Sequence, residues 1–91
     1  MNIITLDFSN CTDIQQIHDV LQKGLGFPED YSRKWIDLQA YLEAFCNPSM
    51  TIRLRGLSHW PEQHLMARAV MLEAFDEASY EHRGMLVEVH P

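Results

Sequence analysis

Cysteine is scarce in this chain, and the sequence opens without the features of a secretory leader. Cys11 and Cys46 are the only two cysteines, whereas small secreted domains carry dense, even-numbered sets of them. The first ten residues, MNIITLDFSN, hold no basic residue and no apolar run of signal-peptide length. We therefore expect a mature, cytoplasmic chain with two free thiols.

The sequence also has no long apolar run and few basic residues. No apolar stretch approaches the roughly 18 residues that a membrane-spanning helix needs, so we expect no membrane anchor. The 7 Lys and Arg residues stand against 13 Asp and Glu, and the formal net charge is -6. Because general affinity for nucleic acid depends on neutralising phosphates, this balance argues against nucleic-acid binding. The acidity is compatible with a basic protein partner, and also with a role in solubility alone.

Local signatures of catalysis and metal binding are missing from the sequence. It has no Gly-rich phosphate loop and no local arrangement of Ser, His and Asp. His59 and His64 flank Glu62, but their spacing matches no known zinc motif. Cys11 precedes a predicted helix start, where a thiol can be reactive, although a small buried side chain is the more common role. We therefore predict a protein that is not an enzyme and has no metal or cofactor.

Three segments rich in β-branched and apolar residues predict β-strands, over residues 2–8, 50–55 and 85–90. The first has apolar residues on both faces, which predicts a strand that is buried on both. The second alternates apolar residues with Thr51, Arg53 and Arg55, so we expect it to be half exposed or near an edge of the sheet.

Three stretches with helical periodicity lie between these strands, within residues 11–26, from about 32 to 45, and within 61–84. Thr12 and Gln15 form a capping-box pattern at the first, and Gly24 and Gly26 are predicted to end it. The predicted core-facing residues of the second helix are Trp35, Leu38, Leu42 and Phe45, and those of the third are Leu65, Ala69, Leu72 and Phe75. A second apolar side of the third helix, Met66, Val70 and Met71, is predicted to cover the sheet, with a soft interaction surface as the alternative.

The order of these elements is strand, helix, helix, strand, helix, strand. Helices between strands favour parallel pairing, because a parallel crossover needs a dozen or more residues. A chain of 91 residues is long enough for one modest core. The sequence therefore predicts a single domain over residues 1–91, an α/β fold in which a small three-stranded, mostly parallel sheet packs with three or four helices.

Three segments, FPEDYSRKWIDLQAYLEAF, MTIRLRGL and LEAFDEA, occur in an order that resembles the barstar family, known for an intracellular inhibitor of the ribonuclease barnase. The resemblance extends over nearly the whole chain. It implies a barstar-like fold and an inhibitor that binds a protein. The residues that match the family's Pro-Glu turn, its Tyr and its sheet-packing helix positions are Pro28, Glu29, Tyr31, Trp35, Leu38 and Leu42.

The sequence departs from the family at the inhibitory face of the second helix. There the family presents two Asp residues, one helical turn apart, to a cationic active site, and an ungapped match puts Ile36 and Ala40 at these positions. Moving Asp37 into register would rotate the helix by about 100° and take the core leucines away from the sheet. Glu77 does match a contact Glu in the family's third helix. Because desolvated cations without partners are costly, the resemblance implies a target other than barnase.

The spacing of three and four residues places Ile36, Gln39, Ala40 and Glu43 on one helix face. Such a face is compatible with ordinary surface apolar residues or with packing under a loop. With the resemblance, it is also compatible with a partner-facing surface that has an apolar centre and an acidic rim. On that interpretation the partner-binding residues are Asp30, Tyr31, Arg33, Ile36, Asp37, Gln39, Ala40, Glu43 and Glu77.

The resemblance implies an immunity or antitoxin-like protein, which blocks the active site of a basic ribonuclease or related toxin with a loop and helix. Acidic rim residues would speed the encounter with such an enzyme, and this effect would weaken as salt rises. The alternative is a barstar-fold scaffold or regulatory protein that binds a non-nuclease partner, or its own copy, through Ile36 and Ala40.

Overall fold

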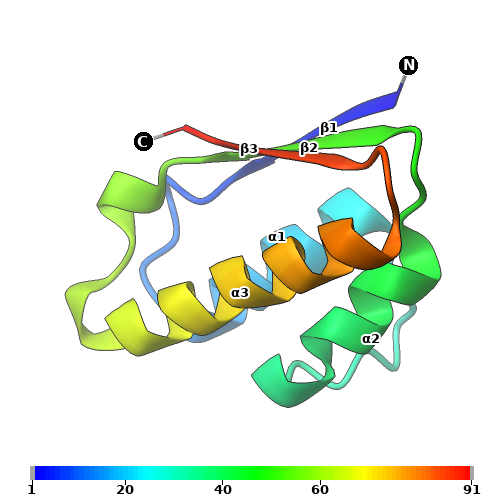
Figure 1. The fold of residues 1–91 in the computed structure, drawn as a ribbon. Coiled ribbons are helices and arrows are strands. Elements are labelled where there is room, and N and C mark those ends of the chain that lie inside the picture. The colour runs from blue at the N-terminus through cyan, green and yellow to red at the C-terminus, as the bar shows by residue number, and fades with distance from the viewer. Residues whose placement is uncertain (1, 91) are drawn as a thin grey trace.

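A computed structural model describes residues 2–90 and contains one parallel sheet. Its three strands are β1 (Asn2–Asp7), β2 (Met50–Arg55) and β3 (Leu86–Val89), in the spatial order β1-β2-β3 (Figure 1). β2 pairs in parallel with both neighbours. The predicted α/β class with a three-stranded parallel sheet is therefore confirmed.

Three α-helices occur within residues 2–90: α1 (Ile14–Leu25), α2 (Trp35–Phe45) and α3 (Leu65–Glu81). Two short 3-10 turns, Leu57–His59 and Glu62–His64, connect β2 to α3. All three helices lie on one side of the sheet (Figure 1). α1 packs on β1 and α3 on β3, whereas α2 packs mainly on α3 and lies farther from the sheet. This arrangement leaves α2 at the surface of the molecule.

The structure changes the predicted environments of the first two strands. β2 is the central strand, and Thr51 on its helix-free face is buried between its register partners Ile3 and Leu86. β1 is an edge strand, where Leu6 is buried but Ile3 is 46% exposed. The predicted edge position of β2 is wrong, because a strand's own pattern does not record which strands become its neighbours, although Arg53 and Arg55 do form a partly exposed face. The predicted burial of both faces of β1 is wrong because the helices cover only one side of the sheet.

The first helix begins one residue later than its capping-box pattern predicted. Asp13 is the N-cap, and its carboxylate accepts a 2.9 Å hydrogen bond from the Gln16 backbone N–H. In return, the backbone N–H of Thr12 donates to the Gln16 side-chain oxygen at 2.6 Å. Gly26 ends the helix as predicted, in a left-handed conformation that glycine adopts without strain, whereas Gly24 lies inside the helix.

The predicted core faces of α2 and α3 are correct only in part. On α2, Leu38 and Leu42 are fully buried, but Phe45 is 40% exposed and Trp35 is half-buried. The buried residues of α3 are Met71, Ala74, Phe75 and Ala78, whereas Leu65, Met66, Ala69 and Val70 are exposed. Since α3 carries apolar residues on more than one side, its periodicity could not select the side that meets the sheet.

Cys11 and Cys46 are both buried and unpaired, as expected for two free thiols. Burial raises the pKa of the Cys11 thiol and raises that of Cys46 to about 11. These environments favour the structural interpretation of Cys11 over a reactive one.

None of the helices formed by residues 2–90 has the length and apolar character needed to cross a bilayer.

Candidate functional site

The candidate site is built on α2 and the loop that leads into it, residues 26–34. The loop is closed by the Gln22 side-chain amide, which donates to the Pro28 carbonyl at 2.8 Å, and by the Tyr31 N–H, which donates to the same carbonyl at 3.0 Å. These contacts hold the Pro-Glu turn against α1. The start of α2 is therefore fixed in position relative to α1.

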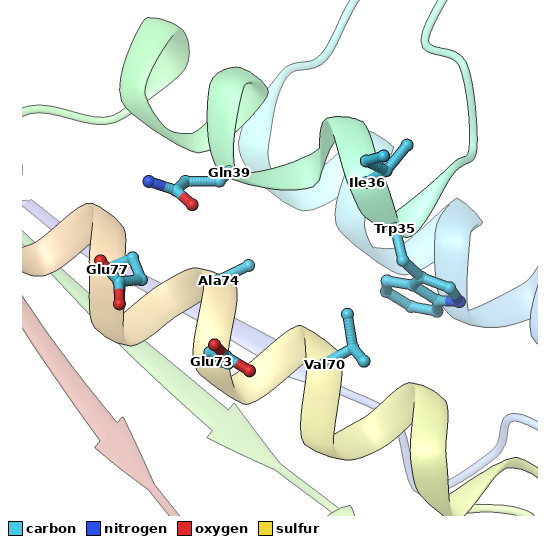
Figure 2. A pocket seen from close by; sticks show the side chains of 7 residues that line it. All are labelled: Trp35, Ile36, Gln39, Val70, Glu73, Ala74 and Glu77. Atoms are coloured by element: carbon cyan, nitrogen blue, oxygen red, sulfur yellow. The ribbon is translucent and has the colours of Figure 1, made fainter.

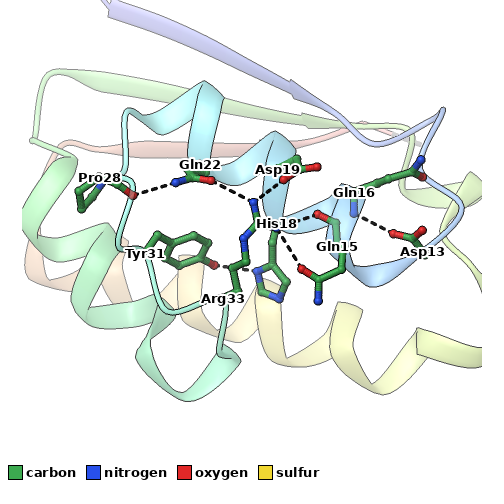
Figure 3. A network of polar contacts seen from close by, with 9 residues as sticks. All are labelled: Asp13, Gln15, Gln16, His18, Asp19, Gln22, Pro28, Tyr31 and Arg33. Carbon is green, nitrogen blue, oxygen red and sulfur yellow. Dashed lines mark hydrogen bonds and ion pairs between the residues drawn. The ribbon is translucent and has the colours of Figure 1, made fainter.

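Arg33 attaches the end of this loop to α1 (Figure 3). Its guanidinium forms an ion pair with Asp19 and donates to the Gln15 carbonyl and to the Gln22 side-chain oxygen, each at 3.1 Å. Arg33 also has a positive φ of 58°, which is uncommon for a residue with a side chain. This conformation ends the loop and delays the start of α2 to Trp35, three residues after the predicted start. The Arg33 side chain, which we predicted to contact a partner, is therefore bound to residues of α1.

Tyr31 lies inside the molecule, close to the start of α2. It is 4% exposed, and its hydroxyl shares a 2.8 Å hydrogen bond with Nδ1 of His18 (Figure 3). The His18 ring also packs on Trp35, the first residue of α2, with ring centroids 4.3 Å apart. Desolvation raises the pKa of Tyr31 to about 12, so its hydroxyl is neutral.

His18 itself is 1% exposed and is held neutral by its surroundings. Its pKa is lowered to about 4, by burial first and by the nearby Arg33 guanidinium second, while Asp19 has an opposing effect. A neutral imidazole beneath the first turn of α2 is thus part of the support for the site. Sequence reasoning missed this role, because His18 shows no motif with residues near it in the chain.

The predicted partner-facing side chains of α2 do not form a single surface. Ile36 is 88% exposed, and it lines a groove between α2 and α3 together with Gln39 and Glu77. Ala40 lines a second, shallower depression with residues of α2 alone, Tyr41, Ala44 and Phe45. Three of the predicted residues are therefore brought together by the fold, and Ala40 is directed to a neighbouring surface.

The remaining acidic candidates line neither depression, and they differ in exposure. Asp30 is exposed in the loop, and Asp37 in the first turn of α2 is partly buried. Glu43 is also partly buried, and its backbone carbonyl accepts a 2.7 Å hydrogen bond from Nε2 of His82. That bond ties the C-terminal turn of α2 to the end of α3, and so fixes the separation of the two helices.

The groove between α2 and α3 has a volume of about 300 Å³ (Figure 2). α2 contributes Trp35, Ile36 and Gln39, and α3 contributes Val70, Glu73, Ala74 and Glu77. The contribution of α3 was missed, apart from Glu77. A signal for it was present in the sequence, because residues 66, 70, 73 and 77 recur at helical spacing on one side of the third helix.

The described residues offer no assembled metal centre. Within residues 2–90, no group of three or more His, Cys, Asp and Glu side chains could hold a metal ion. The groove between α2 and α3 presents apolar side chains, the Gln39 amide and two carboxylates. Such a combination is typical of protein interfaces.

Comparison with known proteins identifies the family. The family model described as Barstar (barnase inhibitor) matches residues 1–90, essentially the whole chain. No match was found among curated proteins. The matched range includes all the strands and helices of the structure, together with the loop that positions α2. This chain therefore belongs to the barstar family, the family of a ribonuclease inhibitor.

Proposed function

We propose that this protein is an intracellular, cytoplasmic inhibitor that acts as an immunity protein or antitoxin. It would block the active site of a ribonuclease or related toxin with the loop and α2. The observation that carries the proposal is the match to the barstar family over residues 1–90. The open position of α2, with Ile36 at 88% exposure, supports a binding role for this helix.

The target that we propose differs from barnase. A barnase-type active site is cationic, and the family meets it with two carboxylates on this helix, where this chain has Ile36 and Ala40. Partner cations that lose water without gaining a carboxylate would weaken the complex. The central contact would instead be apolar, with Asp30, Asp37, Glu43 and Glu77 around it. Arg33 and Tyr31 would act by supporting the loop and α2 rather than by direct contact.

The test is calorimetric titration against a panel of catalytically inactive ribonuclease and nuclease-toxin domains, at low and at high salt. A barnase-type enzyme serves as the reference. We expect submicromolar binding to at least one panel member, weakening as salt rises, and much weaker binding to the reference. Failure to bind any member, or tight binding to the reference, would contradict the proposal as stated.

Two substitutions separate the parts of the proposed interface. Asp37→Lys should slow association several-fold, because it reverses a charge that attracts a basic enzyme, while Ile36→Glu should mainly speed dissociation. Glu62→Lys, in the turn before α3, is a charge-matched control outside the site. Association that is slowed equally by Asp37→Lys and Glu62→Lys would exclude Asp37 from the interface.

A second candidate function is a scaffold or regulatory protein that uses the same helix. The exposure of Ile36, a large apolar side chain, favours burial against another protein or a second copy of this chain. Sedimentation of the unmodified protein and of the Ile36→Glu variant distinguishes the two functions. A self-associating scaffold would become monomeric on substitution, whereas an inhibitor would keep its oligomeric state and lose its target.

A further inference from the structure

The sheet has two edge strands, and only one of them is protected against pairing with another strand. Natural proteins block such edges with short strands, charged side chains or proline. The edge strand β3 has all three, because it spans only Leu86–Val89, contains Glu88 and is followed in the sequence by Pro91. The edge strand β1 is longer, and residues 2–6 contain neither a charged side chain nor proline. The edge of β1 is therefore open to a further strand.

The hydrogen bonds of the sheet show which backbone groups of β1 face outward. The backbone N–H of Phe8 donates to the Arg55 carbonyl at the end of β2, at 2.9 Å. A parallel strand directs alternate residues to the same neighbour, so the even-numbered residues of β1 bond to β2. The N–H and C=O groups of Ile3 and Thr5 then point away from the sheet, and within residues 2–90 they make no hydrogen bond outside it. These groups can pair with a strand that lies alongside β1.

The side chains of β1 suit pairing with a second copy of the same strand. The net charge of -6 makes two copies of this chain repel each other, but Asp7 is the first charged side chain in the sequence. Ile3, Ile4 and Thr5 are β-branched, and such residues favour cross-strand pairs. Ile3 is 46% exposed and Ile4 is only partly buried. Two copies can therefore approach at β1 without bringing carboxylates together, and can bury apolar side chains there.

We propose that β1 pairs with β1 of a second copy in antiparallel orientation, and so joins two three-stranded sheets into one continuous sheet. Two-fold symmetry requires this orientation, and pairing between the outward-facing residues restricts the register. Ile3 of each copy lies opposite Thr5 of the other, and the two Ile4 residues lie opposite each other at the two-fold axis. This register keeps Asp7 outside the paired segments, whereas a shift by two residues would place Asp7 opposite Ile3.

This interface is separate from the surface used in the proposed function. α2 packs mainly on α3 and lies farther from the sheet, whereas β1 contacts β2 and α1. Pairing through β1 would therefore leave α2 accessible in both copies, and one dimer would bind two targets. It also differs from self-association through Ile36, which would join the copies by α2.

The first test is sedimentation equilibrium of the full chain at concentrations up to about 1 mM, which detects even a millimolar dimer. We expect a dimer whose fraction rises with protein concentration. Ile3→Glu should weaken it by about tenfold or more, because symmetry repeats each altered contact. Leu86→Glu is the matched control, since Leu86 is 57% exposed and lies in the same row of the sheet on β3. The control should leave the dimer unchanged.

The second test concerns the backbone pairing itself. Thr5→Pro removes an N–H that faces outward, where an edge strand tolerates proline, so the variant should fold and stay monomeric. In the unmodified protein, hydrogen exchange of the Ile3 and Thr5 amides should slow as the concentration rises, because the dimer bonds them. The Val87 amide, which faces outward from β3, should exchange at a rate independent of concentration.

Several results would overturn the inference. A protein that is monomeric at every concentration has no such interface. Equal weakening by Ile3→Glu and Leu86→Glu would indicate packing between the open faces of two sheets. A dimer that persists in Thr5→Pro would exclude pairing at the β1 edge, and a dimer lost in Ile36→Glu would place the contact at α2. None of these results depends on whether a member of the toxin panel binds.

Discussion

Acid should destabilise this protein through His18, at pH values where most carboxylates are still ionised. The imidazole is 1% exposed, it bonds to the Tyr31 hydroxyl, and it packs on Trp35. Its pKa is lowered from 6.5 to about 4 by burial first and by the Arg33 guanidinium second, against an opposing effect of Asp19. The unfolded chain therefore takes up a proton near pH 6.5, which the folded chain does not bind until about pH 4.

The sign and size of the effect follow from this difference. The stabilisation is fully present above pH 6.5, falls as the pH decreases through the interval from 6.5 to about 4, and is constant below it. With 1.36 kcal/mol for each pH unit, the whole interval corresponds to about 3 kcal/mol, and the change from pH 7 to pH 5 to about 2 kcal/mol. That is a substantial part of the 5 to 15 kcal/mol typical of a folded domain.

The assay is urea unfolding of the unmodified protein and of His18→Gln at pH 7, 6 and 5. Glutamine keeps a hydrogen-bonding group near Tyr31 but does not titrate, so the variant should start less stable and lose much less stability between pH 7 and 5. His59→Gln, at an exposed position, is the matched control substitution. The lowered pKa values of Asp7, Asp19 and Glu88 place their effects at lower pH. Parallel pH profiles for the unmodified protein and His18→Gln would refute the reasoning.

Three further predictions concern the fold that holds the site. Both Gly56 and Gly26 have positive φ, but only at Gly56 would an added Cβ lie 2.5 Å from a backbone nitrogen. In urea unfolding, Gly56→Ala should therefore lower the free energy of unfolding by more than about 2 kcal/mol and Gly26→Ala by only about 1 kcal/mol. Equal losses in the two variants would contradict this. Arg33→Ala should speed hydrogen exchange of the backbone amides of residues 31–34 more than exchange of the β2 amides. The control Arg83→Ala, at an exposed position, should leave exchange of residues 31–34 unchanged. Unchanged exchange in Arg33→Ala would show that the loop does not depend on the guanidinium. Cys11 and Cys46 should resist dithiobis(nitrobenzoate) at pH 8 in the folded protein and react in urea, because both are buried with raised pKa values; fast labelling without urea would argue against their burial.

The sequence alone determined the elements and the class of the fold. Strand and helix patterns are local, since alternation and a period of 3.6 residues arise within each segment, and the positions of β2, α2 and the end of α1 at Gly26 were predicted to within a few residues. The family resemblance was likewise carried by local segments, such as the Pro28-Glu29 turn, and the comparison confirmed it over residues 1–90.

Tertiary structure decided which of these local features meet. The pattern of β2 predicts a strand that is half exposed or near an edge, yet β2 is the central strand because its neighbours come from the two ends of the chain. Tyr31 and Arg33 were predicted to face a partner, but α1 engages them through His18, Asp19 and Gln22, which are 11 to 14 residues away. The groove joins Ile36 to Val70 and Glu77, and its existence depends on how α2 packs on α3. Such contacts depend on packing between elements distant in the chain, and periodicity within one segment carries no information about the side chains that another segment brings to it.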